Sequence, residues 1–275
     1  MKTREKPLAS VIAHAFLMLG AFFMLIPLIW TLSTSLKAPG TEFALPVRWI
    51  PEVFHFENYR DVVTAVPLPR WFLNSLVVAL AASLGQMITG SMAAYAFARI
   101  KFKGRNSLFL LFLATMMIPP QVTIIPLFII IRALGWYDSY PALIVPGLFG
   151  AFSVFIMRQF FLTIPNELED AAKLDGANHG QIYWLVMLPL AGPSLATLGT
   201  FTFMTFWNAF LYPLIVTSSK EMRTLTVGLS TFRDAFTTEW TLLTAGLIIS
   251  MVPVVVAFLI GQRYFIRGIT MTGLK

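Results

Sequence analysis

Cysteine, charge and catalytic motifs are missing or scarce in this chain of 275 residues. It has no cysteine, which excludes disulfide bonds and thiolate metal sites. Only 12% of its residues are charged, against about 25% in an ordinary soluble domain. His14, His55 and His179 lie far apart without metal-ligand spacing, and no paired acids, serine elbow or histidine-glutamate helix motif is present. The sequence therefore predicts no catalytic residue and no metal site.

The chain also lacks a nucleotide site and buried charge of its own. Residues 85–91 have the glycine spacing of a phosphate-binding loop, but they lack its lysine and fall inside an apolar run. Gly90, Ala94 and Ala98 recur every fourth residue there, which favours close packing between helices. No charged residue falls well inside a long apolar run, whereas ion-driven carriers usually need one at membrane depth. A channel or ion-coupled carrier is the alternative class, but the missing charge favours a motor on another polypeptide.

Long apolar runs are what the chain does contain. Hydrophobic residues make up 57% of it, and its mean hydropathy is +0.75. A helix needs about 20 residues to cross about 30 Å of hydrocarbon, whereas barrel strands would alternate over about 10 residues. We predict an all-α polytopic membrane protein that forms a single transmembrane domain over residues 1–275. Its six spanning helices are expected at 11–32, 72–97, 107–131, 140–157, 190–216 and 241–262.

The net charge of +7 is distributed unequally across this arrangement. With both termini on one side, that side holds twelve basic and five acidic residues, and the other side holds eight of each. The positive-inside rule then places both termini in the cytoplasm and residues 37–70, 132–139 and 217–240 outside. The prolines of 37–70 suggest an irregular loop. The basic excess sets topology and does not indicate a nucleic-acid partner.

An acidic segment at residues 165–189 carries helix start and stop signals between two apolar runs. Asn166 is expected to cap a helix, with Glu169 reaching back to it, and Gly176 falls where that helix would end. Asn178 with Gln181 repeats the capping pattern, and the second helix would run to Pro189. Two capped helices in a loop outside the bilayer predict a docking site for another protein, the alternative being that these residues only cap and solvate a turn.

The same segment resembles the EAA loop of ABC importer permeases. That motif reads Glu-Ala-Ala, three residues, Gly, nine residues, Ile, one residue, Leu-Pro; here Asp170 replaces the Glu and Val186 replaces the Ile. The variant in this chain is similar to the maltose-type second permease of the carbohydrate-importing branch. The matching residues are Asp170-Ala171-Ala172, Gly176, Val186-Met187-Leu188-Pro189, Asn74-Ser75-Leu76, Trp207-Asn208, Tyr212-Pro213-Leu214, Leu225-Thr226-Val227-Gly228-Leu229, Gln262-Arg263-Tyr264-Phe265 and Arg267-Gly268.

The resemblance implies one subunit of a binding-protein-dependent importer in a bacterial or archaeal plasma membrane. Its partners would be a second permease in a heterodimer, two ATPase subunits, an extracytoplasmic solute-binding protein and the lipid bilayer. This chain would bind no cofactor and catalyse nothing, because ATP and magnesium belong to the partner ATPase. The solute would be a sugar or oligosaccharide, with a polyol or glycerol phosphate as the alternative.

The resemblance also implies roles for particular residues. A cytoplasmic coupling loop at 158–189 would engage the ATPase, and the basic C-terminal stretch would help to hold it. Aromatic rings and an amide in the fifth run, together with Gln121 beside a helix break expected at Pro119-Pro120, suggest a sugar path, although such residues also occur in interfacial belts and helix contacts. The coupling residues are Glu169, Asp170, Ala171, Ala172, Asp175, Gly176, Leu188 and Pro189. The solute-path residues are Gln121, Trp207, Asn208 and Tyr212, and the C-terminal ATPase contacts are Gln262, Arg263 and Arg267.

Overall fold

The computed structural model describes residues 7–233 and 238–272, which form helices joined by loops and one isolated bridge between Arg233 and Thr238. The chain divides into two compact units, one of residues 1–68 and 229–251 and the other of residues 69–228 and 252–275. The all-α prediction is confirmed for the described residues. We describe the two units separately.

The first unit contains a long apolar helix followed by a folded loop. Helix α1 (Pro7–Ser35) contains the first predicted span. The irregular loop predicted for 37–70 is wrong in part, because residues 57–65 form helix α2 (Glu57–Ala65). Asn58 is buried and donates from Nδ2 to the carbonyl oxygens of Ser35 (3.0 Å) and Lys37 (2.8 Å). These bonds fasten the start of α2 to the end of α1, which composition alone does not reveal. The unit also contains the 3-10 turn Ser230–Phe232 and the first part of α14 (Trp240–Thr272).

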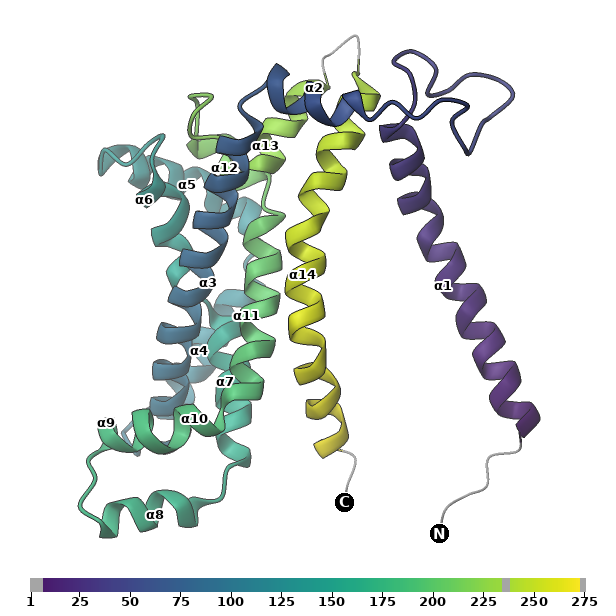
Figure 1. The fold of residues 1–275 in the computed structure, drawn as a ribbon. Coiled ribbons are helices and arrows are strands. Elements are labelled where there is room, and N and C mark those ends of the chain that lie inside the picture. The colour runs from purple at the N-terminus through teal and green to yellow at the C-terminus, as the bar shows by residue number, and fades with distance from the viewer. Residues whose placement is uncertain (1–6, 234–237, 273–275) are drawn as a thin grey trace. The chain divides into compact units, whose positions relative to one another are not determined.

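The second unit contains most of the remaining helices (Figure 1). Their bounds are α3 (Leu68–Arg99), α4 (Arg105–Ala114), α5 (Pro120–Ala133), α6 (Tyr140–Ile144), α7 (Ala151–Thr163), α8 (Asn166–Leu174), α9 (His179–Ile182), α10 (Leu188–Leu190), α11 (Gly192–Trp207), α12 (Leu211–Val216) and α13 (Leu225–Leu229). A π-helical turn at Tyr183–Met187 joins α9 to α10, and 3-10 turns follow α4 and α6.

Four described helices are long and apolar enough to span a membrane, and up to six if each sharply bent pair counts as one span. The expected run 107–131 bends by 97° between Met117 and Pro120. Proline there lacks the N–H that a continuous helix requires. The expected run 190–216 is likewise not one helix, because α11 ends at Trp207 and α12 begins at Leu211. The run expected to end at 157 continues to Thr163. The predicted loop between these runs, which we call the loop segment, is taken from here on as residues 164–190.

Helices α3 and α7 pack closely, as the small-residue pattern predicted. A Cβ atom on Gly90 would lie 2.7 Å from the Cβ of Ser153, so the two backbones approach too closely for any side chain at residue 90. Ala94 is fully buried and Ala98 is 7% exposed in the same core. Close approach of small residues is a usual basis of helix association in membranes, where hydrophobic burial adds little.

The unit has two polar ends. Figure 1 shows α8, α9 and α10 together at one end and α6 at the other. At the α6 end, the Asp138 carboxylate accepts hydrogen bonds from the amides of Ser218 (2.8 Å) and Ser219 (3.1 Å). Burial would raise the pKa of the Asp138 carboxyl, but these hydrogen bonds outweigh it and hold the pKa below its usual value. The loop predicted outside at 132–139 therefore meets the start of the one predicted at 217–240.

We predict that single cysteines at residues 218 and 107 differ in labelling by an impermeant thiol reagent in intact cells. Both native serines are exposed, and the native chain offers no competing thiol. Ser218→Cys should react from outside, whereas Ser107→Cys of α4 should react only after the membrane is permeabilised, because the basic loop before α4 predicts a cytoplasmic position. Equal labelling of both variants in intact cells would contradict this topology.

Candidate coupling surface

Helix α8 ends in a tight turn that fixes the direction of the chain. Gly176 has a φ of +83°. Its amide donates to the carbonyl oxygen of Lys173 (3.0 Å), and the amide of Ala177 donates to that of Ala172 (2.9 Å). These two bonds are the Schellman pattern that closes a helix at a left-handed residue. The prediction that Gly176 ends this helix with a positive φ is confirmed.

The loop segment has a first arm, which contains α8, and a second arm, which runs from Asn178 to Leu190. The second arm begins with a capping box. The amide of Gln181 donates to Asn178 Oδ1 and the amide of Asn178 donates to Gln181 Oε1, both at 2.9 Å. This predicted start signal is confirmed. Ile182 and Met187 are buried against the helices above them. The second arm therefore packs into the core of the unit through its apolar side chains.

The start of α8 is not capped as we predicted. Pro165 holds the N-cap position, and no side chain caps the helix. Asn166 is the first helical residue, and its Oδ1 accepts a hydrogen bond from the guanidinium of Arg99. Glu169 is 4% exposed, and it faces Arg99 instead of reaching back to the helix start. The prediction failed because a tertiary cation attracts both side chains more strongly than the local backbone does.

Arg99 joins three successive parts of the chain. It is the last residue of α3, and its guanidinium donates to the carbonyl oxygens of Phe161 (2.5 Å) and Ile164, as well as to Asn166. Its Nε lies 3.9 Å from Glu169 Oε2, and both side chains are about 5% exposed. Removal of one member of such a buried pair costs about 3–5 kcal/mol, because the other charge is left uncompensated.

Lys173 closes the network on its solvent side. Its Nζ lies 3.0 Å from Glu169 Oε1 and 3.7 Å from Asp170 Oδ1. The hydrogen bond to Glu169 raises the pKa of the Lys173 ammonium above its usual value, so it stays charged at physiological pH. Exposed pairs of this i,i+4 kind contribute little to stability. The contact of Glu169 with buried Arg99 therefore contributes more to holding α8 in place than its contact with Lys173 does.

The opposite face of α8 is open. Glu167, Asp170, Ala171 and Leu174 are exposed, and their spacing of three and four residues places them on one face of the helix. Leu174 is 90% exposed. It was missed by our sequence analysis, although a large apolar residue in the last turn of a polar helix was a usable signal. The predicted coupling residues divide accordingly: Asp170 and Ala171 lie on the open face, whereas Ala172 and Leu188 pack against the core and Glu169 is buried. Asp175, Gly176 and Pro189 are exposed.

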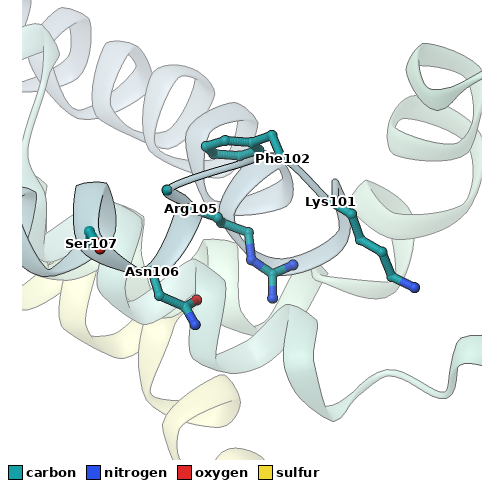
Figure 2. A pocket seen from close by; sticks show the side chains of 6 residues that line it. Lys101, Phe102, Arg105, Asn106 and Ser107 are labelled. Carbon is teal, nitrogen blue, oxygen red and sulfur yellow. The ribbon is translucent and has the colours of Figure 1, made fainter.

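A basic loop between α3 and α4 leads away from Arg99. This loop borders a hollow of ≈ 360 Å³. Figure 2 shows five of the side chains that line it, those of Lys101, Phe102, Arg105, Asn106 and Ser107. Arg105 directs its guanidinium toward the carbonyl oxygens of Ala98 (3.5 Å) and Ile100 (3.3 Å) at the end of α3. The loop follows directly on the end of α3, where Arg99 holds α8.

The residues predicted for a solute path do not all gather. Trp207 is 2% exposed and packs with Phe203 and Phe72 at centroid distances of 5.7 and 5.3 Å. Asn208 is exposed and donates to the carbonyl oxygen of its own helix at Met204 (2.8 Å). Gln121 and Tyr212 both line one hollow of ≈ 430 Å³.

The predicted C-terminal contacts lie along the last part of α14. Its C-terminal end points to the same end of the unit as α8 and α10 (Figure 1). Gln262 donates to the carbonyl oxygen of Leu259 (3.2 Å), and Arg263 is exposed and donates to the Tyr264 hydroxyl (2.9 Å). Arg267 lies outside the residues whose side chains the structure describes.

We predict that Gly176→Val loosens the loop segment while Gly176→Asn does not. A Cβ atom at residue 176 would meet nothing within 4 Å, so the cost is that of the left-handed backbone, about 1–2 kcal/mol. Asparagine tolerates that conformation, whereas a β-branched residue does not. A nitroxide attached to Ala171→Cys should become more mobile in the valine variant. Gly192→Ala is the matched control, because that glycine also has open space but no positive φ. Equal mobility in the valine variant and the unmodified protein would contradict the prediction.

Comparisons with known proteins agree with this arrangement. The family model for "Binding-protein-dependent transport system inner membrane component" matches residues 86–271. A solved bacterial ABC transporter involved in alginate import contains a chain of the same fold, with a TM-score of 0.83 and 24% identity over 96% of this chain and 99% of that one. The MetNI methionine ABC transporter contains a more distant one, with a TM-score of 0.56 and 20% identity over 71% and 93%.

Curated relatives match over nearly their whole length. The arabinooligosaccharides transport system permease protein AraQ of Halalkalibacterium halodurans is 36% identical over 100% of both chains. The sn-glycerol-3-phosphate transport system permease protein UgpE of Brucella abortus is 32% identical over 98% of both. The diacetylchitobiose uptake system permease protein NgcG of Streptomyces coelicolor is 31% identical over 92% of this chain and 85% of its own. This chain therefore belongs to the family of inner-membrane components of binding-protein-dependent transport systems, and it is a permease subunit of an ABC importer.

Proposed function

We propose that this permease imports a neutral oligosaccharide and is driven by an ATPase subunit that docks on the open face of α8. The carrying observation is the division of that helix. Glu169 is buried on the side of Arg99, whereas Asp170, Ala171 and Leu174 remain exposed on the other side. An exposed leucine flanked by acids suits a partner cleft with an apolar floor and a basic rim.

The work would reach the solute by alternating access. This chain supplies α8, which the ATPase moves, and the path of the solute through the membrane. ATP and its magnesium ion are bound by the ATPase, which supplies the energy. A second permease and an external solute-binding protein complete the importer, as the membership of a binding-protein-dependent family supports. No catalytic role falls to this chain. Arg263, which is exposed near the end of α14, would add a second contact with the ATPase at the end of the unit where α8 lies.

A neutral solute is favoured by the hollows between α5 and α11. One of ≈ 430 Å³ is lined by Gln121, Thr123 and Tyr212 among apolar residues, and a neighbouring one of ≈ 790 Å³ by Gln86, Thr115 and Thr202. Of the described residues that line these two hollows, none is charged. Amides, hydroxyls and aromatic rings suit sugar hydroxyls, whereas a phosphate ester needs a cation. This favours an oligosaccharide, as in the name of the AraQ relative, over glycerol phosphate, as in that of UgpE.

Asp170→Lys should reduce the ATPase recovered with the purified complex by at least about tenfold, which corresponds to 1.4 kcal/mol. A lysine there would meet the basic rim as a like charge, and such juxtapositions cost several kcal/mol. Residue 170 lies outside the spanning helices, so the amount of the variant in the membrane should not change. Asp61→Lys is the matched control, since it makes the same exchange on exposed helix α2 at the predicted outer side. Full recovery of ATPase with the Asp170→Lys variant would overturn the docking proposal.

The solute class is tested independently with the cognate solute-binding protein. Titration calorimetry against arabino-oligosaccharides, malto-oligosaccharides and glycerol 3-phosphate should give heat with a neutral oligosaccharide. The same ligand should stimulate ATP hydrolysis by the reconstituted complex. Binding of glycerol 3-phosphate alone would leave the permease assignment standing and replace the proposed solute.

A further inference from the structure

Three polar side chains of α3 hold the loop segment from above. Ser91, Tyr95 and Arg99 follow one another at intervals of four residues, so they lie on one face of that helix. The Ser91 Oγ lies 2.8 Å from the Tyr183 hydroxyl, and the Tyr95 hydroxyl lies 3.1 Å from His179 Nδ1. Both partners belong to the second arm of the loop segment.

Arg99 makes the corresponding contact with the first arm. It is the one member of the three that carries charge, and it binds the end of α7, the linker residue Ile164 and the start of α8 at once. Lysine could not replace this set of bonds, because a single ammonium lacks the planar fork of donors that a guanidinium presents. The α3 face therefore touches both arms of the loop segment.

The Nε of Arg99 donates no hydrogen bond to any residue that the structure describes. It is shielded from solvent and has no hydrogen-bond partner within normal reach, and the nearest carboxylate oxygen is Glu169 Oε2 at 3.9 Å. Glu169 is in turn held on its other side by Lys173 of its own helix. The carboxylate thus links a buried cation of α3 to the body of α8, on the face opposite the proposed docking surface.

We infer that Arg99 and Glu169 are positioning residues that transmit the movement of α8 to α3. Without this link, a movement of α8 would change the conformation of the linkers at 164–165 and 175–178 and would leave α3 in place. With it, the displacement passes to the last turn of a 32-residue helix. The inference rests on the proposed function, since it assumes that an ATPase moves α8, but it concerns residues that the ATPase does not touch.

The test compares Arg99→Gln and Glu169→Gln with Lys173→Gln. Each removes one charge, but Lys173 is 46% exposed and binds Glu169 from the solvent side. In reconstituted importer, solute transported per ATP hydrolysed should fall at least about fivefold in the first two variants, the lower range of a coupling between sites. Lys173→Gln should leave this ratio within about twofold, as expected for an exposed pair. The Arg99→Gln, Glu169→Gln double variant should be no worse than the poorer single variant, because the two act as one unit.

A distance measurement separates positioning from a general loss of stability. The chain has no cysteine, so nitroxides can be placed on Leu168→Cys of α8 and on Ser107→Cys in the first turn of α4, whose Arg105 hydrogen-bonds to the end of α3. The distance distribution should be narrow in the otherwise unmodified protein and in Lys173→Gln, and broader in Arg99→Gln and Glu169→Gln. If Arg99→Gln does not reach the membrane, Glu169→Gln, which keeps the buried shape, decides the result.

Co-purification of the ATPase keeps this inference distinct from the proposed function. Arg99→Gln and Glu169→Gln change no residue of the docking face, and Lys173→Gln changes only a neighbour of Asp170 there, so each variant should retain the ATPase. A lowered transport ratio with retained ATPase supports the inference. An unchanged ratio and an unchanged distance distribution with retained ATPase overturn it and leave the docking proposal intact. Failure of the unmodified chain to retain any ATPase would instead overturn the proposed function.

Discussion

Backbone groups inside hydrocarbon have no water to bond, so a chain that crosses a bilayer must satisfy them within its own helices. That constraint moves polar structure to the helix ends, and in this permease the ends are where its described polar contacts concentrate. At one end of the second unit, the buried side chain of Arg99 holds the start of α8. At the other, buried Asn74 donates to the carbonyl oxygens of Glu221 (2.7 Å) and Arg223 (2.9 Å).

Helix α3 contains both of these anchors. Asn74 lies in its second turn and Arg99 is its last residue. Between them, Gly90 and Ala94 let α7 approach closely, so the contact between these two helices is made by backbone and small side chains. A dense contact of this kind transmits a displacement, because close-packed interiors are not readily compressed. The hollows that suit a neutral sugar lie beside this helix pair, and Gln86 of α3 lines the larger one. One helix therefore connects the proposed motor contact with the proposed solute path.

Local signals in the sequence predicted much of this arrangement, and tertiary contacts account for the rest. The apolar runs located the long helices but not the breaks within 107–131 and 190–216. Gly176 and the Asn178–Gln181 box marked real boundaries, because each acts through its own backbone. Asn166 and Glu169 were assigned to a capping box, whereas both bind Arg99, which is distant in sequence and had been counted only as a topology signal. The break at 208–210 and the burial of Trp207 depend on packing against other helices. The motif does not specify which face of α8 is buried. It therefore could not tell which of the predicted coupling residues are exposed to a partner.

The central claim is that the ATPase subunit docks on the open face of α8, and crosslinking tests this claim most directly. A photoreactive amino acid in place of Leu174, which is 90% exposed at the end of that face, should crosslink to the ATPase subunit when membranes are irradiated. The same group in place of Leu162, exposed on the spanning helix α7, should not crosslink to it. Crosslinking at residue 174 to the ATPase alone is the result that the account predicts. An absence of ATPase crosslinks at residue 174, in membranes where the importer transports its solute, would contradict it.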